Sequence, residues 1–398
     1  MKAINSNRDA QKTRRIRQAM EKQGYDALLL RLPENVTYAS GYWPLGGISF
    51  VVFPRDQEPT FIGHNFEPPP GTWITDIRSY VCESLQEIAD PVRNSSKTVA
   101  EVLREKRLDK CKLGLELSAE AIGGTYLKWR SSGISKYTTD SLARELPNCT
   151  FDDAMPMLYE IRSRKTEQEV DKLRIANKVA RYGLEVFEEG LVEGKTEGEL
   201  AAEIETATVT EGLRHVKKAS HIMPCAFLVS GKETANAHGW VYGNGRRRLR
   251  KGDLAMLEFD VIVDGYCSDT TRTFTVGKAA MRQRALLEAV KEAHDEAIES
   301  IKPGITCSKV ADIAHTVIEK NGYGKFLKHY VGHGLGVTIW EPIPSLHPAS
   351  QGKLMPGMVH SIEPGVYVKG FGGVRTEDNV LDTSSGTELL SNYPYFLD

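Results

Sequence analysis

The chain has 398 residues, and its 51 Lys and Arg nearly balance its 53 Asp and Glu, which gives a formal net charge of −2 at pH 7. A chain so close to neutral offers no electrostatic reason to bind nucleic acid or an anionic membrane. The length suffices for two domains, and 40% hydrophobic with 26% charged residues is ordinary for a globular protein.

The amino-terminal segment is polar and basic and lacks the apolar stretch of a secretory signal. No apolar run approaches the roughly 20 residues that are needed to cross a bilayer. The six cysteines are scattered without a CxxC pair, which indicates free thiols in a reducing compartment. We therefore expect a cytoplasmic protein.

The first part of the chain alternates strand-like and helix-like segments. This alternation is typical of an α/β domain, which we expect to cover residues 1–155. Short apolar runs predict buried strands over 27–30, 48–53 and 59–63, a helix is expected over 98–106, and another strand over 112–117.

The second part, residues 156–398, begins with helix-start signals. Thr166 with Glu169, and Thr196 with Glu199, each form a capping box, which predicts a helix after each pair. Two further helices are expected at about 280–301 and 309–320, with strand-like segments between the helix pairs. The pattern predicts a duplicated α+β plan.

A hairpin is predicted around Asp264-Gly265, a strong two-residue turn signal between apolar-rich arms. Because side chains alternate along a strand, Glu258 and Asp260 share one face, and folding the arms back brings Asp269 opposite that face. Acidic side chains that converge in this way repel one another unless a cation binds. Taken alone, the pattern also fits a solvated hairpin face with unrelated acids.

Three later segments add polar side chains in tight settings, namely His333 in YVGHGLG, Glu363 in SIEPGVY and Glu377 in VRTEDNV. Each by itself also fits a hydrogen-bonded core histidine or an exposed carboxylate. Together with the hairpin they offer one imidazole among carboxylates, which suits a pair of divalent ions that share an activated water. We therefore expect a hydrolytic enzyme if these residues meet in space.

The order and spacing of these motifs resemble the pita-bread metallopeptidase family, which includes methionine aminopeptidase, Xaa-Pro aminopeptidase, prolidase and creatinase. The matching stretches are GDLAMLEFDVIVDGYCSDTTRTF, VGHGLG, SIEPGVY and VRTEDNVL, and IRSRKTEQEVDKL resembles the segment that opens the catalytic domain. The resemblance implies an α+β pita-bread catalytic domain behind an α/β amino-terminal domain of the creatinase and prolidase type. Relatives with that amino-terminal domain are commonly dimers, so we expect a homodimer.

The resemblance also assigns roles. It implies two divalent ions (manganese, cobalt or zinc) that are bridged by Asp269 and Glu377, with Glu258 on one ion and both His333 and Glu363 on the other. Glu363 would also shuttle a proton to the leaving nitrogen. The remaining assignment is His238 as the residue that contacts substrate and stabilises the tetrahedral intermediate. Because Arg272 and Arg375 stand next to ligands in the sequence, we expect them to hold ligand carboxylates in place.

Two positions depart from the family pattern. Glu258 stands where the family has an aspartate, and Asp260 could substitute for it or add a ligand where the family commonly keeps a small residue. Trp340 stands where a histidine usually donates to the scissile carbonyl, and tryptophan cannot exchange a proton. Trp240 and Trp340 fit either the walls of an apolar pocket for a proline-like ring or the ordinary core.

We expect a Xaa-Pro dipeptidase or aminopeptidase that acts on a small peptide. A creatinase-like hydrolase or lyase of a small non-peptide substrate is the alternative that the substitutions at Glu258 and Trp340 favour. A third reading is a non-catalytic pita-bread binding module, which would predict erosion of the whole ligand set.

Overall fold

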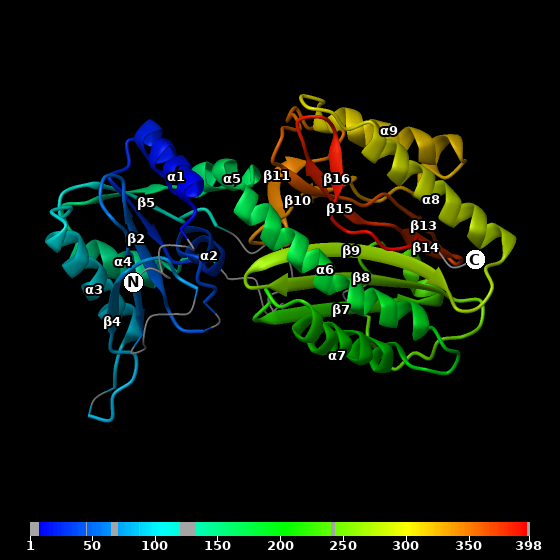
Figure 1. Ribbon diagram of the computed structural model, residues 1–398, viewed down its shortest axis with the longest axis horizontal. Coiled ribbons are helices and arrows are strands. Elements are labelled where there is room, and N and C mark those ends of the chain that lie inside the picture. The colour runs from blue at the N-terminus through cyan, green and yellow to red at the C-terminus, as the bar shows by residue number, and fades with distance from the viewer. Residues whose placement is uncertain are drawn as a thin grey trace. The chain divides into compact units, whose positions relative to one another are not determined.

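The computed structural model describes residues 8–44, 46–64, 71–86, 88–119, 133–239 and 243–395, so that Trp240 lies outside the described residues. The chain forms two compact units, Met1–Arg162 and Ser163–Asp398, whose elements are labelled in Figure 1.

The first unit is built on a mixed sheet with the strand order β4-β3-β2-β1-β5-β6. The central strand β1 pairs antiparallel with β2 and parallel with β5. The strands predicted at 27–30, 48–53, 59–63 and 112–117 are confirmed, and each end differs from the prediction by no more than two residues. The strands are β1 (Ala27–Leu30), β2 (Phe50–Pro54), β3 (Thr60–His64), β4 (Asp76–Tyr80), β5 (Lys112–Leu115) and β6 (Thr150–Asp153).

Helices pack on this sheet because they carry an apolar stripe. In α3, which begins after the capping residue Asp90, Val99 and Leu103 are fully buried in a core that they share with Leu29 and Leu113 of the sheet. The helix that we expect over 98–106 is therefore the second half of α3. The helices of this part are α1 (Ala10–Gln23), α2 (Pro33–Ser40), α3 (Pro91–Glu105), α4 (Lys136–Glu145) and α5 (Met155–Ser163).

The second unit begins with two helices that cover a sheet of order β7-β8-β9. Both predicted capping boxes are present, since Thr166 and Thr196 accept from the backbone of Glu169 and Glu199, whose side chains reach back. Helix α6 contacts β8 and β9, and α7 contacts β7 (Figure 1). The bounds are α6 (Glu167–Glu189), α7 (Glu197–His215), β7 (Ile222–Ser230), the 3-10 helix η2 (Gly231–Ala235), β8 (Leu254–Val263) and β9 (Tyr266–Thr275).

The rest of this unit repeats the plan of a helix pair with strands, as predicted. Helix α8 contacts β12, β13 and β14, and α8 also packs along α9. One sheet has the order β11-β10-β12-β15-β16, and β13 pairs with β14. The bounds are α8 (Met281–Glu299), α9 (Cys307–Lys320), η4 (Gly324–Phe326), β10 (His333–Gly334), β11 (Glu341–Ser345), β12 (Val359–Ile362), β13 (Gly365–Val368), β14 (Gly372–Arg375), β15 (Asp378–Asp382) and β16 (Thr387–Leu389).

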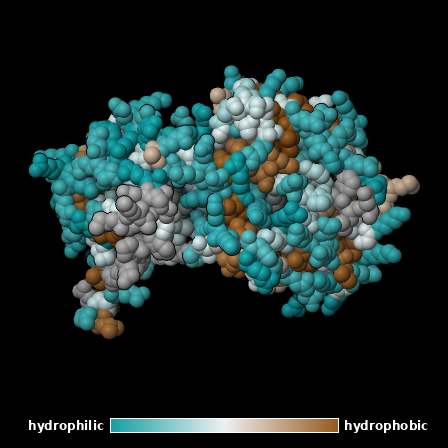
Figure 2. Space-filling model, in the orientation of Figure 1, coloured by the Kyte–Doolittle hydropathy of each residue, from teal (hydrophilic) through white to brown (hydrophobic). Residues whose placement is uncertain are grey.

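The surface carries some exposed hydrophobic residues among polar ones. Figure 2 shows that the visible face of each unit is mostly hydrophilic, with hydrophobic side chains in scattered patches. Leu85 and Ile88, between β4 and α3, are fully exposed. Among the described residues no helix is both long enough and apolar enough to cross a membrane. The six cysteines are free thiols.

Candidate metal centre

The β8–β9 hairpin brings the first acids together. Asp264 and Gly265 both have positive φ, 49° and 84°, as the predicted two-residue turn requires. The register that follows places Asp260 directly opposite Asp269, and Glu258 opposite Thr271. Asp260 and Asp269 are 6% and 2% exposed, so their carboxylates face each other almost without water.

His333 lies between two carboxylates. Its Nε2 is 3.5 Å from Oδ2 of Asp269 and 3.5 Å from Oε1 of Glu363. Its Nδ1 donates to the carbonyl oxygen of Gly334, 3.0 Å away, which fixes the ring so that Nε2 points at the acids. The residue begins β10, and Glu363 directly follows β12, which pairs with β10. Two segments that are adjacent in the sheet thus supply this half of the site.

Glu377 joins the cluster from the turn between β14 and β15. Its backbone pairs with that of Thr271 on β9, and its Oε2 accepts from the hydroxyl of Thr271 at 2.7 Å. Carboxylate and imidazole atoms of Asp269, His333 and Glu377 lie within 4.8 Å of one another. Carboxylate oxygens of Glu258, Asp260 and Asp269 also lie within 4.8 Å of one another.

Glu258 belongs to the cluster but has a positively charged neighbour. Its carboxylate contacts the Nη2 of Arg375, and its Oε2 lies 2.8 Å from the hydroxyl of Thr271, whose single proton Glu258 shares with Glu377. Arg375 is 3% exposed and lies at the end of β14. The expectation that Arg375 holds a carboxylate of the cluster agrees with this contact.

Burial and mutual repulsion oppose simultaneous ionisation of the acids in the cluster. Burial raises the pKa of Asp269 well above its usual range, and the charges of Glu377, Asp260 and Glu363 raise it further. The pKa of Glu363 is raised for the same reasons, burial first and Glu377 next. Burial also raises the pKa of Glu377, against the opposing charge of Arg375. Such groups stay protonated or bind cations.

The donor set fits hard divalent ions. Oδ1 of Asp269 is buried and receives no hydrogen bond from the described residues, so a carboxylate oxygen is left for another partner. Oxygen ligands with one imidazole suit manganese, cobalt or zinc and do not select among them. The residues could therefore hold the ions that the sequence predicts.

His238 lies in the loop that follows η2, with an exposed side chain. Partial desolvation lowers its pKa, and the charge of Arg375 lowers it further, so the imidazole lies within electrostatic reach of Arg375. Trp340 is half-buried, and its ring centre is 6.4 Å from that of His333. Trp340 thus lies beside His333 and His238 lies near Arg375, and within the described part of the chain neither side chain hydrogen-bonds to a carboxylate of the cluster.

Among the residues that the structure describes, Arg272 contacts the backbone of the cluster and not its carboxylates. It is fully buried, pairs with Asp378 at 2.7 Å and donates to the backbone carbonyl of Glu377 at 2.6 Å. It therefore positions Glu377 through its main chain. We expected it to hold a ligand carboxylate, whereas the carboxylate that it contacts is Asp378.

Sequence reasoning missed several polar residues around the acids. Tyr367 accepts from Nη1 of Arg375 at 3.0 Å and lies 2.8 Å from Nε2 of His329, whose Nδ1 is 4.0 Å from Glu363. This chain links the two sides of the cluster. The only sequence signal was a second histidine four residues before His333.

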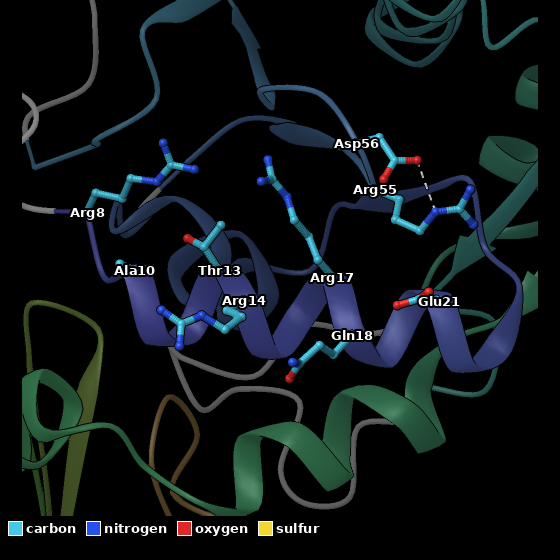
Figure 3. A pocket seen from close by; sticks show the side chains of 9 residues that line it. All are labelled: Arg8, Ala10, Thr13, Arg14, Arg17, Gln18, Glu21, Arg55 and Asp56. Atoms are coloured by element: carbon cyan, nitrogen blue, oxygen red, sulfur yellow. Dashed lines mark hydrogen bonds and ion pairs between the residues drawn. The ribbon is translucent and has the colours of Figure 1, made fainter.

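A separate cavity of about 540 Å³ lies on the first unit, between α1 and the residues that follow β2 (Figure 3). Three of the four arginines that line it have acidic partners, since Arg55 pairs with Asp56, and Arg8 and Arg17 pair with Glu58. It contains none of the residues that the sequence singles out. We assign no function to it.

Comparison with known proteins gives matches along almost the whole chain. Residues 171–384 match the model of metallopeptidase family M24, and residues 12–164 match the creatinase/prolidase amino-terminal domain. The Xaa-Pro dipeptidase of Pyrococcus furiosus is 30% identical over 373 residues, which are 94% of this chain and 95% of that protein.

Solved structures agree with this result. The prolidase from Pyrococcus horikoshii OT3 superimposes with a TM-score of 0.77 at 26% identity, covering 96% of this chain and 99% of that chain. The Xaa-Pro dipeptidase from Bacillus anthracis gives 0.79 at 25% identity, with 97% and 99% covered. The expected pita-bread catalytic unit with a creatinase-type amino-terminal unit is confirmed.

Proposed function

The chain belongs to metallopeptidase family M24 and is a metal-dependent hydrolase, and on this premise we propose that it is a Xaa-Pro dipeptidase or aminopeptidase. The observation that carries the proposal is the position of His333, whose Nε2 lies 3.5 Å from a carboxylate oxygen of Asp269 on β9 and 3.5 Å from one of Glu363, directly after β12. The names of the similar proteins, Xaa-Pro dipeptidase and prolidase, supply the substrate class.

We propose Asp269, His333, Glu363 and Glu377 as ligands of two divalent ions, with manganese, cobalt and zinc as candidates. Bound ions would supply Lewis acidity and a water that is ionised near neutral pH. Asp269 and Glu377 would each contribute to holding both ions, a role supported by the position of Asp269 beside His333 and by the contact of Glu377 with Thr271 on β9. The role of Glu258 as a fifth ligand stays a prediction.

The protein residues have separate tasks in hydrolysis. Glu363 takes a proton from the attacking water and delivers it to the leaving nitrogen, a role supported by the position of its carboxylate in the cluster, 3.5 Å from Nε2 of His333. His238 orients the substrate carbonyl from the loop after η2. Trp340 packs against the substrate from the side of His333.

The alternatives are less well supported. A creatinase-like small-molecule hydrolase or lyase and a non-catalytic binding module are not favoured by relatives that are named as dipeptidases and prolidases. We further propose that the protein is a cytoplasmic homodimer. The exposed Leu85 and Ile88 of the first unit are candidates for a contact between copies.

The test is turnover by chelated and dialysed protein that is reloaded with manganese, cobalt or zinc. We expect hydrolysis of Xaa-Pro dipeptides or of Xaa-Pro-Xaa tripeptides, with the relative rates deciding between dipeptidase and aminopeptidase. An Ala-Ala dipeptide is the substrate control, and His333→Ala is the control variant. Metal-loaded protein that cleaves none of the proline peptides would exclude the proposed substrate class.

A further inference from the structure

We propose that Asp260 takes the ligand position that the family resemblance gives to Glu258, and that Arg375 keeps Glu258 outside the coordination shell. The inference rests on the proposed function only in that it requires a metal site. It concerns which carboxylate of β8 reaches the ion.

The geometry of the hairpin favours Asp260. It is the residue directly opposite Asp269, and the two side chains are hydrogen-bonded, so their oxygens already converge on one point. Glu258 lies two pairs further along the ladder, opposite Thr271. A strand repeats on the same face every second residue, so the backbones of the two acids of β8 are about 6.6 Å apart. Because Glu258, Asp260 and Asp269 still offer oxygens within 4.8 Å of one another, the neighbours of each carboxylate decide between Glu258 and Asp260.

Several hydrogen bonds hold the guanidinium of Arg375 beside the carboxylate of Glu258. Its Nε donates to Thr271 at 3.0 Å, and its Nη1 donates to the hydroxyl of Tyr367 at 3.0 Å and to the carbonyl of Ala237 at 3.2 Å. Its Nη2 contacts Glu258. A metal ion on the Glu258 carboxylate would therefore stand next to a buried positive charge, which repels it strongly at low dielectric.

Charge balance leads to the same assignment. The cluster holds the carboxylates of Glu258 and Asp260 on β8, with Asp269, Glu363 and Glu377 on other segments. Arg375 offsets one negative charge, and two divalent ions offset the other four. If Glu258 bound metal instead, Arg375 would lose its carboxylate and Asp260 would be a surplus buried charge, and burying an uncompensated charge is strongly unfavourable.

The experiment compares Asp260→Asn with Glu258→Gln, two variants that each remove one charge from the same face of β8. Each protein is stripped with chelator, reloaded with Mn(II) and dialysed, and its bound manganese is counted by elemental analysis. EPR spectra distinguish a spin-coupled ion pair from an isolated ion. We expect Asp260→Asn to lose one of two equivalents and the coupled spectrum, while Glu258→Gln keeps both.

Because Glu258→Gln leaves Arg375 without its partner, the double variant Glu258→Gln/Arg375→Gln serves as a matched second test. It should also keep both ions. Loss of an ion in either variant at Glu258, with a folded protein by circular dichroism, would overturn the inference, as would full retention in Asp260→Asn. A wild type that binds two ions and cleaves no proline peptide would instead refute the proposed substrate and leave this assignment standing.

Discussion

The indole Nε1 of Trp340 donates a hydrogen bond to the hydroxyl of Tyr330 at a distance of 2.8 Å. Tryptophan has one N–H, so this bond occupies the only donor of the side chain. The role that the family resemblance gives to a histidine at this position, donation to the scissile carbonyl, is therefore not available to Trp340 in this arrangement. Tyr330 in turn keeps its proton, because burial and then the charge of Glu363 raise its pKa.

Trp340→Phe tests this relationship. Since the indole N–H is already committed to Tyr330, its loss should lower kcat/KM by less than about 10-fold, well short of the roughly 100-fold or more that follows loss of an oxyanion donor. The missing hydrogen bond should lower the free energy of unfolding by about 1 kcal/mol. Urea unfolding of Trp340→Phe, Tyr330→Phe and the double variant should show that the two losses are not additive. A 100-fold loss of activity would mean that Trp340 itself contacts the transition state.

The stability of the metal-free protein should fall as the pH rises. The pKa values of Asp269, Glu363 and Glu377 are raised in the folded state, so the folded protein holds protons that the unfolded chain has already released. Stability therefore decreases from about pH 5 towards pH 8, at most by about 1.4 kcal/mol per pH unit for each such group. Urea midpoints of the chelated protein at several pH values check this, and Asp269→Asn should flatten the profile. A profile that rises with pH would show that the acids are ionised without metal.

Divalent metal should reverse that loss. Ions that bind only the folded state stabilise it by about 2.7 kcal/mol at a hundredfold excess over Kd, and they replace the protons of the acids. We expect the Tm of the chelated protein to rise on addition of Mn(II), more at pH 8 than at pH 6. His333→Ala should respond less because it lacks the imidazole. An unchanged Tm at any manganese concentration would exclude the site.

Glu363→Gln separates proton transfer from binding. The amide keeps the size of the side chain but cannot accept a proton from water, so kcat should fall by about 100-fold or more. KM for a Xaa-Pro dipeptide should change little, and metal analysis shows how much of the loss comes from occupancy. Ser361→Ala, which removes the 3.4 Å contact to Glu363 and a hydrogen bond from the backbone N–H of His333 but keeps the carboxylate, is the control. Nearly full activity in Glu363→Gln would assign the proton transfer to another group.

Asp378→Asn should be among the most destabilising single changes in the second unit. Asp378 and Arg272 form a fully buried ion pair at 2.7 Å, and loss of one partner leaves the other charge uncompensated, at a cost of about 3–5 kcal/mol. Ser391→Ala removes a hydroxyl that donates to Asp378 and accepts from the backbone N–H of Asn379, but it leaves the ion pair in place and should cost about 1–3 kcal/mol. Urea unfolding compares the two, and equal midpoints would contradict the ion-pair argument.

The sequence alone determined the features that depend on local signals. The helices after Thr166 and Thr196 begin where a capping box satisfies their first amides, and Asp264-Gly265 fixes the hairpin because both residues adopt positive φ. The two-residue turn also sets the register of the hairpin. The proximity of Asp260 and Asp269 could therefore be predicted from the alternation of side chains along the strands. The motif order was enough to identify the family and the fold.

Only the tertiary structure decided which partners these side chains find. Glu258 meets Arg375, and Trp340 meets Tyr330, through contacts between segments whose approach no local pattern encodes. Likewise Arg272 contacts Asp378 and the main chain of Glu377, although the sequence placed it only beside a ligand. The physical reason is that turn and cap preferences act between neighbouring residues, whereas the distribution of buried charge is settled by packing across the whole unit.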